Sequence, residues 1–270
     1  MTPYKLGFAG AGNMAQSIIK GALSSSTLRP QDIFIYDIDA SLTQSLQESL
    51  GILACSSLAQ LCVNADIIIL AVKPNVMAAL LDGLKEHIDG KPVVSIAAGW
   101  SADMIAQIIG ADKFICRLMP NTPLMVGEGM SVFESPCNLP EDKKAFVESL
   151  FSSLGAISHA PQKAMDAVTA VSGSGPAYVF MFIEALSDAG VLCGLSREQA
   201  TLLAAQTVMG SAKMILKTGS HPGILKDAVC SPGGTTIEAV KSLEHDGFRG
   251  CVIKAVEKSA KKSKSLSQLT

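Results

Sequence analysis

The chain has 270 residues, of which 48% are hydrophobic and 17% are charged, and its formal net charge is −2. This length favours two domains over one, and the apolar fraction is sufficient for a large core. The nearly balanced charge excludes a general electrostatic attraction to nucleic acid or to an anionic membrane.

The first 160 residues alternate between short β-rich runs and helical stretches. The runs "KLGFA", "DIFIYD", "IIILAV", "PVVSIAA" and "KFICRLM" are continuously apolar or nearly so, as in strands covered on both faces. Helices are expected over residues 14–24, 41–50, 76–86, 101–109 and 141–154, and later strands over residues 129–135 and 156–160. This alternation predicts an α/β, Rossmann-like N-terminal domain over residues 1–161, built on a mostly parallel, doubly wound sheet.

After residue 161 the alternation stops, and the remaining stretches are typical of helices. They cover residues 164–171, 176–192, 196–218 and 235–246, with a further helix from about residue 248. Within the third stretch, "SREQ" is a capping box and Gly219 is placed to end the helix. The segment "AYVFMFIEAL" carries one charge in ten residues, so its helix requires burial on every side. We therefore predict an all-α domain over residues 162–270 that forms a homo-oligomer through this helix; the alternative is that the helix lies at the centre of a monomeric bundle.

The segment "GFAGAGNMA" places Gly10, Gly12 and Ala15 in the pattern G-x-G-x-x-A, between the first strand and the first helix. Gly10 permits a tight turn, Gly12 lets the backbone approach a pyrophosphate, and Ala15 allows close packing of helix and strand. The pyrophosphate would accept hydrogen bonds at the positive end of the helix. This motif predicts a dinucleotide site; the alternative is a plain glycine-rich turn.

Asp37 stands at the end of the second strand. A carboxylate at this position accepts a hydrogen bond from the ribose 2′-OH and repels a 2′-phosphate, which favours NAD over NADP. Asp39 is a rival for the same role, and aspartate at a strand end also serves turns.

Three further strand ends lie where open parallel sheets bind ligands: "AVKP", "AAG" and "MPNTP". Lys73 in the first of them could reach a cofactor ribose or phosphate. The alternative is an exposed lysine before a proline-induced turn.

A second glycine-rich segment, "SPGGTTIEAV", precedes a late helix. Thr235 and Glu238 match a capping box, which satisfies the backbone N–H groups of these two residues. The N–H groups of Thr236 and Ile237 stay unpaired and form a seat for a small carboxylate, with a hydroxyl of Ser231 or Thr236 to orient it. The alternative is a helix cap without a ligand.

The segment "SGSGPAY" is interpreted mainly as a helix start, with Pro176 in the first turn, and less as a ligand contact. No Ser/His/Asp, Cys/His or paired-carboxylate arrangement stands out, which fits a reductase because a cofactor supplies its chemistry. Seven cysteines are scattered singly and the four histidines lack metal-ligand spacing, so we predict reduced thiols, no metal site and a cytoplasmic location. No secretory signal or membrane-spanning run is apparent.

The segments "GFAGAGNMA", "AVKP", "VSIAAG", "MPNTP", "SGSGPAYVF" and "CSPGGTTIEAV", in this order over nearly the whole chain, closely resemble the pyrroline-5-carboxylate reductases of the bacterial type. The resemblance implies reduction of the small cyclic imine 1-pyrroline-5-carboxylate to L-proline, the last step of proline biosynthesis. NADP (as NADPH) is the implied cofactor, with NAD (as NADH) as the alternative. The resemblance also implies homodimers joined through the helical domain and assembled into decamers, with no nucleic-acid or membrane partner.

Residue by residue, the pattern and the resemblance together give two sets of expected site residues. The cofactor-binding set is Ala9, Gly10, Ala11, Gly12, Asn13, Met14, Asp37, Val72, Lys73, Ala98 and Asn121. The substrate-binding set is Ser231, Gly233, Gly234, Thr235 and Thr236, in which Gly234 to Thr236 would bind the carboxylate through backbone N–H groups. Thr236 is the candidate catalytic residue, as a hydroxyl near the ring nitrogen that orients the substrate. Family members often carry Ser or Thr where Asp37 stands, so this departure leaves NADH use open.

Two other functions compete with this one. A 3-hydroxyacid dehydrogenase would need a catalytic lysine or histidine on a helix of the second domain, and Lys163 and Lys213 are candidates without a supporting motif. A non-catalytic, dinucleotide-sensing oligomer would leave the second glycine-rich segment without a purpose.

Overall fold

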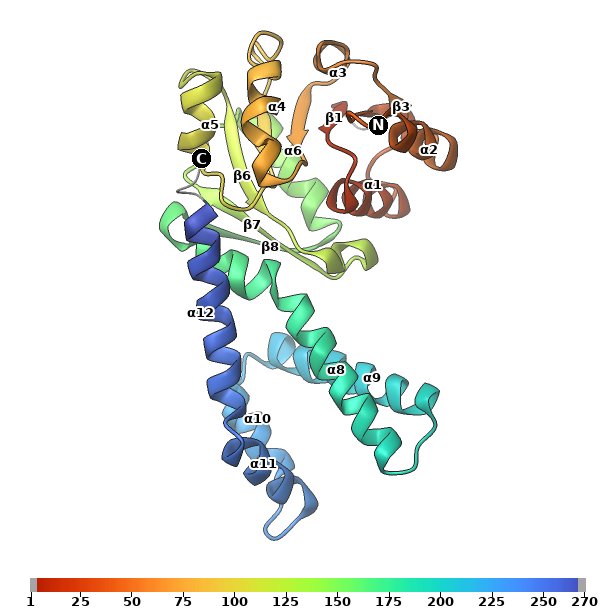
Figure 1. Cartoon of the computed structure of the whole chain (residues 1–270), viewed down its shortest axis with the longest axis vertical. Coiled ribbons are helices and arrows are strands. Elements are labelled where there is room, and N and C mark those ends of the chain that lie inside the picture. Colours follow the sequence, from red (N-terminus) through yellow and green to blue (C-terminus); the bar gives the residue numbers. More distant parts are fainter. Residues whose placement is uncertain (1–3, 267–270) are drawn as a thin grey trace. The chain divides into compact units, whose positions relative to one another are not determined.

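The computed structural model describes residues 4–266, which form two compact units. Unit 1 comprises the chain up to Ser174 and again from Ser259 onward. Unit 2 comprises Gly175–Lys258 and is entirely helical apart from its connections (Figure 1).

Unit 1 is built on an eight-stranded sheet in the order β3-β2-β1-β4-β5-β6-β7-β8. The strands are β1 Leu6–Ala9, β2 Ile33–Tyr36, β3 Leu53–Ala54, β4 Ile67–Leu70, β5 Val93–Ser95, β6 Ile115–Met119, β7 Gly129–Ser135 and β8 Gly155–Pro161. The first six are parallel, β7 runs antiparallel to β6, and β8 runs parallel to β7. The order of the first six strands is that of dinucleotide-binding folds. The predicted fold class, with its mostly parallel, doubly wound sheet, is confirmed.

Helices cover both faces of this sheet. They are α1 Asn13–Ser24, α2 Ala40–Leu50, α3 Leu58–Asn64, α4 Met77–Leu84, α5 Ala102–Ile109 and α6 Glu141–Ser152. The elements β3 and α3 were not predicted. A two-residue strand and a seven-residue helix are too short to establish a periodic pattern.

The strand β4 shows why the sheet is buried on both sides. Ile67 and Ile69 belong to one hydrophobic cluster, with α1 and α6, whereas Ile68 and Leu70 belong to the other, with α4 and α5. All four side chains are fully buried. The continuous apolar runs of the sequence therefore correspond to strands with a core on each face.

The chain turns helical after β8, which ends at Pro161. A short 3₁₀ turn leads into α7 Met165–Val168 and then into a π-helical turn, Thr169–Gly173. The sequence predicted an uninterrupted helix over residues 164–171, and the wider turn was not foreseen. As a domain boundary, the division between residues 161 and 162 stays a prediction.

Unit 2 contains α8 Gly175–Leu192, α9 Arg197–Thr218, α10 Pro222–Val229 and α11 Thr235–His245; α12 Phe248–Leu266 crosses from unit 2 into unit 1. Ser196 caps α9 by accepting a hydrogen bond from the N–H of Gln199, and Gly219, at φ +65°, ends it, both as predicted. The helix α10 was not predicted, because proline and glycine at its start are also typical of a loop.

Unit 2 lacks a core of its own. Its buried residues are small: Ser187, Ala200 and Ala204. Large apolar side chains lie open instead, and Met181 and Leu216, for example, are 69% and 85% exposed. Helices with this much exposed apolar surface complete their packing against another chain, in agreement with the predicted homo-oligomer.

One helical stretch, Gln162–Leu192, is long and apolar enough to cross a membrane by length and composition alone. No uninterrupted apolar run of this length was predicted from the sequence, because polar and small residues separate the apolar ones in this stretch. Only 6% of its most apolar window is buried within the chain. The stretch includes the apolar side chains of α8, so the predicted homo-oligomer offers an explanation for this exposure.

Candidate functional site

The first glycine-rich loop joins β1 to α1 and is fixed from two sides. The N–H of Gly10 donates to the carbonyl of Tyr36 at 2.8 Å, and the N–H of Ala71 donates to the carbonyl of Ala9 at 2.8 Å. Gly10 has φ +108°, and a Cβ at this position would lie 2.6 Å from the carbonyl oxygen of Ala71. Only glycine fits here, because the backbone conformation and the neighbouring strand both exclude a side chain.

The N-terminus of α1 is open. Its N-cap residue is Gly12, no side chain caps it, and no acidic residue stands in its first turn. A Cβ built on Gly12 meets nothing within 4 Å. The free N–H groups of the first turn and the helix dipole therefore lie beside open space, an arrangement that fits the pyrophosphate of a dinucleotide.

A cleft of about 280 Å³ lies at the carboxyl ends of the central strands, within unit 1. Its lining residues are Met14, Ala71, Val72, Ile96, Ala98, Met119, Pro120, Thr169, Gly173 and Ser174. All three strand ends selected from the sequence contribute to this wall, through Val72, Ala98 and Pro120. The lining is mostly apolar, as expected for a pocket that holds a flat ring.

Part of this wall was missed by the sequence analysis. Thr169, Gly173 and Ser174 come from the π-helical turn and from the "SGSG" segment, which was interpreted mainly as a helix start. The Thr169 hydroxyl donates to the carbonyl of Met165 at 2.8 Å, inside the turn. π-Helical turns are frequent at functional sites, and the density of Gly and Ser in this segment was the available signal.

Asn121 and Lys73 have different surroundings. The Asn121 side chain accepts a hydrogen bond from the N–H of Met130 at 2.8 Å and donates to the carbonyl of Ser172 at 3.2 Å, so it ties the end of β6 to the π-helical turn. Lys73 is exposed, three residues after the end of β4. Contact of either side chain with a cofactor stays a prediction.

The two aspartates after β2 have distinct partners. Asp37 accepts hydrogen bonds from the N–H of Ala11 at 2.7 Å and from the N–H of Asp39 at 3.0 Å, so it connects β2 to the first glycine-rich loop. Asp39 is the N-cap of α2, and one of its oxygens accepts from the N–H groups of Ser41 and Leu42. A hydrogen bond from the Ser41 hydroxyl, with those from the backbone, holds the pKa of Asp39 below its usual value.

The second glycine-rich loop leads into α11 in unit 2. Gly233 has φ +68°, and the N–H of Gly234 donates to the carbonyl of Ser231 at 3.0 Å, closing a tight turn. The expected capping box is wrong: Gly234 is the N-cap, no side chain caps the helix, and Thr235 is its first residue. The two glycines turn the chain one residue earlier than the T-x-x-E pattern indicates.

This shift changes which donors are free. The N–H of Gly234 is engaged within the turn and does not serve as the donor it was expected to be. By helix geometry the N–H groups of Thr235, Thr236 and Ile237 all lack an intrahelical acceptor. The seat for an anion thus begins at Thr235.

The helices α1 and α11 begin in the same way. Both have a glycine N-cap in extended conformation, with φ −68° and ψ 179° for Gly12 and φ −80° and ψ 170° for Gly234, and neither has a side-chain cap. Several other helices are capped by a side chain, as α5 is by Ser101 and α9 by Ser196, whereas α4 and α6 also lack such a cap but do not begin with a glycine. The two glycine-capped helices therefore keep donors that a ligand can use.

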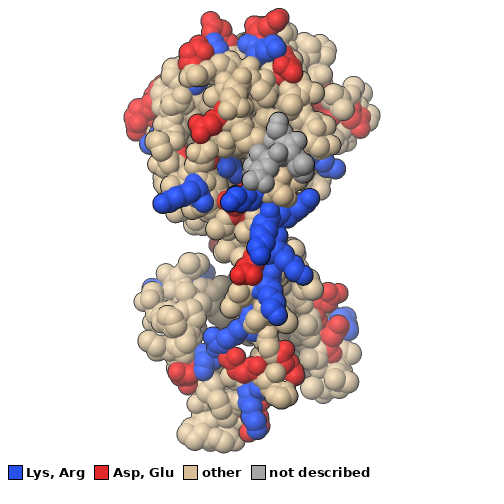
Figure 2. All heavy atoms as spheres, turned by 60° about the vertical axis from the view of Figure 1, so that its left-hand side comes forward, with Lys and Arg blue, Asp and Glu red and all other residues tan. Residues whose placement is uncertain are grey.

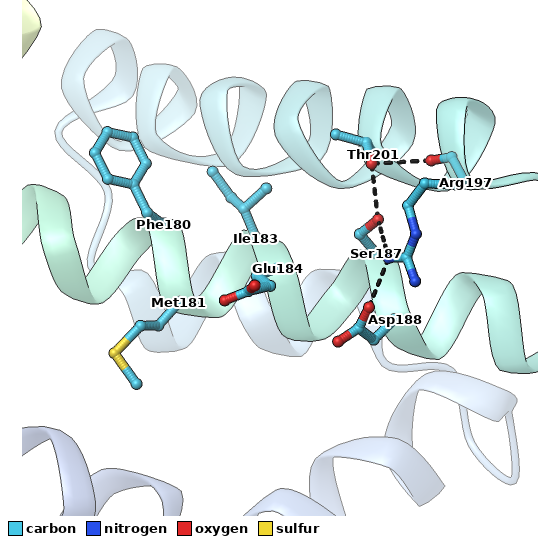
Figure 3. A pocket seen from close by; sticks show the side chains of 8 residues that line it. All are labelled: Phe180, Met181, Ile183, Glu184, Ser187, Asp188, Arg197 and Thr201. Carbon is cyan, nitrogen blue, oxygen red and sulfur yellow. Dashed lines mark hydrogen bonds and ion pairs between the residues drawn. The ribbon is translucent and has the colours of Figure 1, made fainter.

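A groove of about 610 Å³ between α8 and α9 contains none of the expected site residues (Figure 3). At one end Arg197 donates to the Ser187 hydroxyl at 3.0 Å and to the Asp188 carboxylate at 2.6 Å, and Ser187 lies 2.8 Å from the Thr201 hydroxyl. Phe180 lies at the other end. Ser187, Asp188, Arg197 and Thr201 hydrogen-bond among themselves and the apolar groups are open, which suits a helix interface better than a catalytic site.

Among residues 4–266, no group of three His, Cys, Asp or Glu side chains is placed to hold a metal ion. All seven cysteines are free.

Comparison with known proteins covers both regions of the chain. Residues 162–266 match the family described as "Pyrroline-5-carboxylate reductase dimerisation", and residues 5–99 match "NADP oxidoreductase coenzyme F420-dependent". The pyrroline-5-carboxylate reductase of Escherichia coli (strain K12) is 47% identical over 266 residues, covering 98% of both chains. That of Arabidopsis thaliana is 45% identical over 266 residues, covering 98% of this chain and 96% of the relative. The crystal structure of Plasmodium falciparum pyrroline carboxylate reductase with NADP bound has a TM-score of 0.91 and 36% identity, covering 99% of both chains.

Proposed function

The chain belongs to the pyrroline-5-carboxylate reductase family, and from this premise we propose which of its residues bind the cofactor and which bind and orient the substrate. The protein is an NAD(P)H-dependent oxidoreductase that reduces 1-pyrroline-5-carboxylate to L-proline, the last step of proline biosynthesis. The observation that carries this function is the 47% identity to a named reductase over 98% of both chains. Membership in the family sets aside the 3-hydroxyacid dehydrogenase and the non-catalytic sensor.

Unit 1 binds the dinucleotide. We assign its pyrophosphate to the loop Ala9–Met14, because the free N–H groups of α1 and the open space beside Gly12 fit this group. Val72, Lys73 and Ala98 would border the remainder of the cofactor, with Asn121 beside them. When bound, NADPH or NADH supplies a hydride to the imine carbon of the substrate.

The loop Ser231–Thr236 holds the substrate in this proposal. The backbone N–H groups of Thr235 and Thr236 donate to its carboxylate, aided by the dipole of α11, while Gly233 and Gly234 keep the approach free of side chains. Fixing the carboxylate fixes the ring, and holding the imine carbon in an attack geometry accounts for most of the rate enhancement.

Thr236 orients the ring nitrogen through its hydroxyl. A threonine hydroxyl is a poor acid, so the nitrogen either binds already protonated or takes its proton from water. The residue is thus a hydrogen-bonding partner of the substrate and not a proton donor.

Kinetics of two neighbouring variants test this assignment. Thr236→Ala should lower kcat/KM. The loss should correspond to about 1–3 kcal/mol of transition-state stabilisation, the effect of removing one hydrogen bond to a charged group. Thr235→Ala is the matched control, because it keeps the backbone N–H and removes a hydroxyl to which no role is assigned. Unchanged kinetics in Thr236→Ala would exclude the role, and absence of nicotinamide oxidation by the native protein would exclude the reaction itself.

Three further properties belong to this proposal. We place the domain boundary between residues 161 and 162, at the end of β8. We also propose that homodimers, which the family match supports, assemble into a decamer. Sedimentation velocity checks this assembly, since a decamer should sediment with the mass of ten chains. The free cysteines support a location in the reducing cytoplasm.

A further inference from the structure

The corner between β2 and α2 bears on which dinucleotide the protein prefers. This inference rests on the proposed function, since it concerns the cofactor held by the loop Ala9–Met14. In dinucleotide-binding folds, the residues that follow the second strand meet the 2′ position of the adenosine ribose.

A carboxylate is fixed at this corner. Asp37 follows β2 directly, and backbone N–H groups of Ala11 and Asp39 donate to its two oxygens at 2.7 and 3.0 Å. These bonds prevent the side chain from turning away from a ligand. A carboxylate keeps further lone pairs, so Asp37 can still accept a hydrogen bond from a ribose 2′-OH.

The donors that would hold a phosphate are already in use. A 2′-phosphate at this corner could be bound by the first N–H groups of α2 and by a nearby hydroxyl. Here the Asp39 carboxylate accepts from the N–H groups of Ser41 at 3.0 Å and Leu42 at 3.3 Å, and from the Ser41 hydroxyl. The protein's own anion thus occupies the N-terminus of α2.

Within residues 4–266, neither of these carboxylates is paired with a lysine or arginine. Residues 30–72, which include β2, α2, β3 and α3, contain no lysine or arginine. Arg29 stands before β2, at the opposite end of that strand, and is paired with Asp32 at 2.7 Å. Lys73 follows β4, which β1 separates from β2. Positive charge gathers elsewhere, notably along α12 (Figure 2).

We propose that Asp37 and Asp39 together select against the 2′-phosphate, so that this reductase binds NADH more tightly than NADPH. The 2′-OH of NADH gains a hydrogen-bond acceptor in Asp37. The 2′-phosphate of NADPH would be repelled by two carboxylates. The N–H groups at the start of α2 already donate to Asp39, and no lysine or arginine in residues 30–72 is available to bind the phosphate.

Equilibrium binding to the full-length oligomer, without imine, tests this selectivity. Nicotinamide fluorescence gives the Kd of NADH and of NADPH, and we expect the Kd of NADPH to be larger by at least about fivefold at low salt. The ratio should fall as salt screens the carboxylates.

Charge-neutralising variants locate the effect. Asp37→Asn and Asp39→Ser each keep a side-chain acceptor, and each should lower the ratio of the two Kd values; the double variant should lower it further. Asp82→Asn, an exposed site on α4, is the matched control and should leave the ratio unchanged. Thermal unfolding of each variant checks that it is folded.

The outcomes separate the two proposals. This inference is overturned if the native protein binds NADPH as tightly as NADH. It is also overturned if Asp37→Asn and Asp39→Ser both leave the ratio of the two Kd values unchanged. Either result leaves the reductase assignment intact. Native protein that binds neither dinucleotide contradicts the proposed function instead.

Discussion

The two units of this protein use their apolar residues in opposite ways. In unit 1, Ile67 to Leu70 are fully buried between two helical layers of the same chain. In unit 2, Phe180 and Leu216 are 63% and 85% exposed, and only small residues are buried. Both units are rich in hydrophobic residues, so composition alone does not tell whether burial takes place within one chain or between two.

This difference extends to the proposed sites. The cofactor loop and its cleft lie in the unit that is complete in one chain. The loop Ser231–Thr236 lies in the unit that requires a second copy to cover its helices. We therefore expect oligomerisation to influence the substrate site more than the cofactor site.

The largest expected effect comes from a charge placed on α8. Phe180→Glu puts a carboxylate on the apolar face that we expect to form the interface in both copies, and each uncompensated buried charge costs at least about 3 kcal/mol, or at least about 6 kcal/mol per dimer. Sedimentation equilibrium should show a loss of oligomer mass. Val63→Glu is the control, since Val63 is 80% exposed on α3 of unit 1 and this variant should keep the native mass.

A cavity in unit 1 should act within one chain. Phe151 on α6 is fully buried, and Phe151→Ala should lower the free energy of unfolding by about 3–5 kcal/mol. Calorimetry measures this loss as a lower Tm, while the oligomer mass of the folded protein stays native. Dissociation of the folded variant would show that the two units are less independent than we infer.

Two glycines in the cofactor loop separate folding from binding. Gly10→Ala should cost about 1–3 kcal/mol of stability, because alanine is strained at φ +108° and its Cβ would approach the carbonyl of Ala71. The Cβ of Gly12→Ala would point into open space, so this variant should keep the native Tm. Its methyl group would occupy space that we assign to the pyrophosphate, so the Kd of the dinucleotide should rise. A stable Gly10→Ala variant, or an unstable Gly12→Ala variant, would contradict the structure of this loop.

The smallest expected effect is a pH dependence at α2. The pKa of Asp39 is lowered in the folded state, so the stability it contributes is present above its unfolded pKa of about 4. That contribution is lost as the pH falls through the folded pKa. The Tm difference between native protein and Asp39→Asn should therefore shrink on acidification, and a difference that grows would reverse the assigned sign.

Much of the fold was predictable because local patterns agree with the tertiary structure. The apolar runs identified the long strands, and the glycine spacing identified the first helix N-terminus. The exposed face of α8 followed from "AYVFMFIEAL", whose single charge is incompatible with a solvated helix.

The remainder depends on geometry that a pattern does not contain. The T-x-x-E pattern at Thr235 competes with the turn at Gly233, and the turn decides where α11 begins. The π-helical turn at Thr169–Gly173 interrupts a helix, and the Ser and Gly at its end signal a break without specifying a π-helical turn. The sequence names Asp37 and Asp39 as rivals for the ribose, which stays a prediction, and the contacts that distinguish the two residues are visible only in three dimensions.

Amide hydrogen exchange of the Phe180→Glu variant, beside the native oligomer, tests most directly whether unit 1 is complete alone and unit 2 is completed by a second copy. We expect amides of β1, β4 and β5 to keep their native protection in the dissociated protein, while those of α8, α9 and α11 lose it. A dissociated variant whose unit 2 helices stay as protected as in the native oligomer would contradict this account.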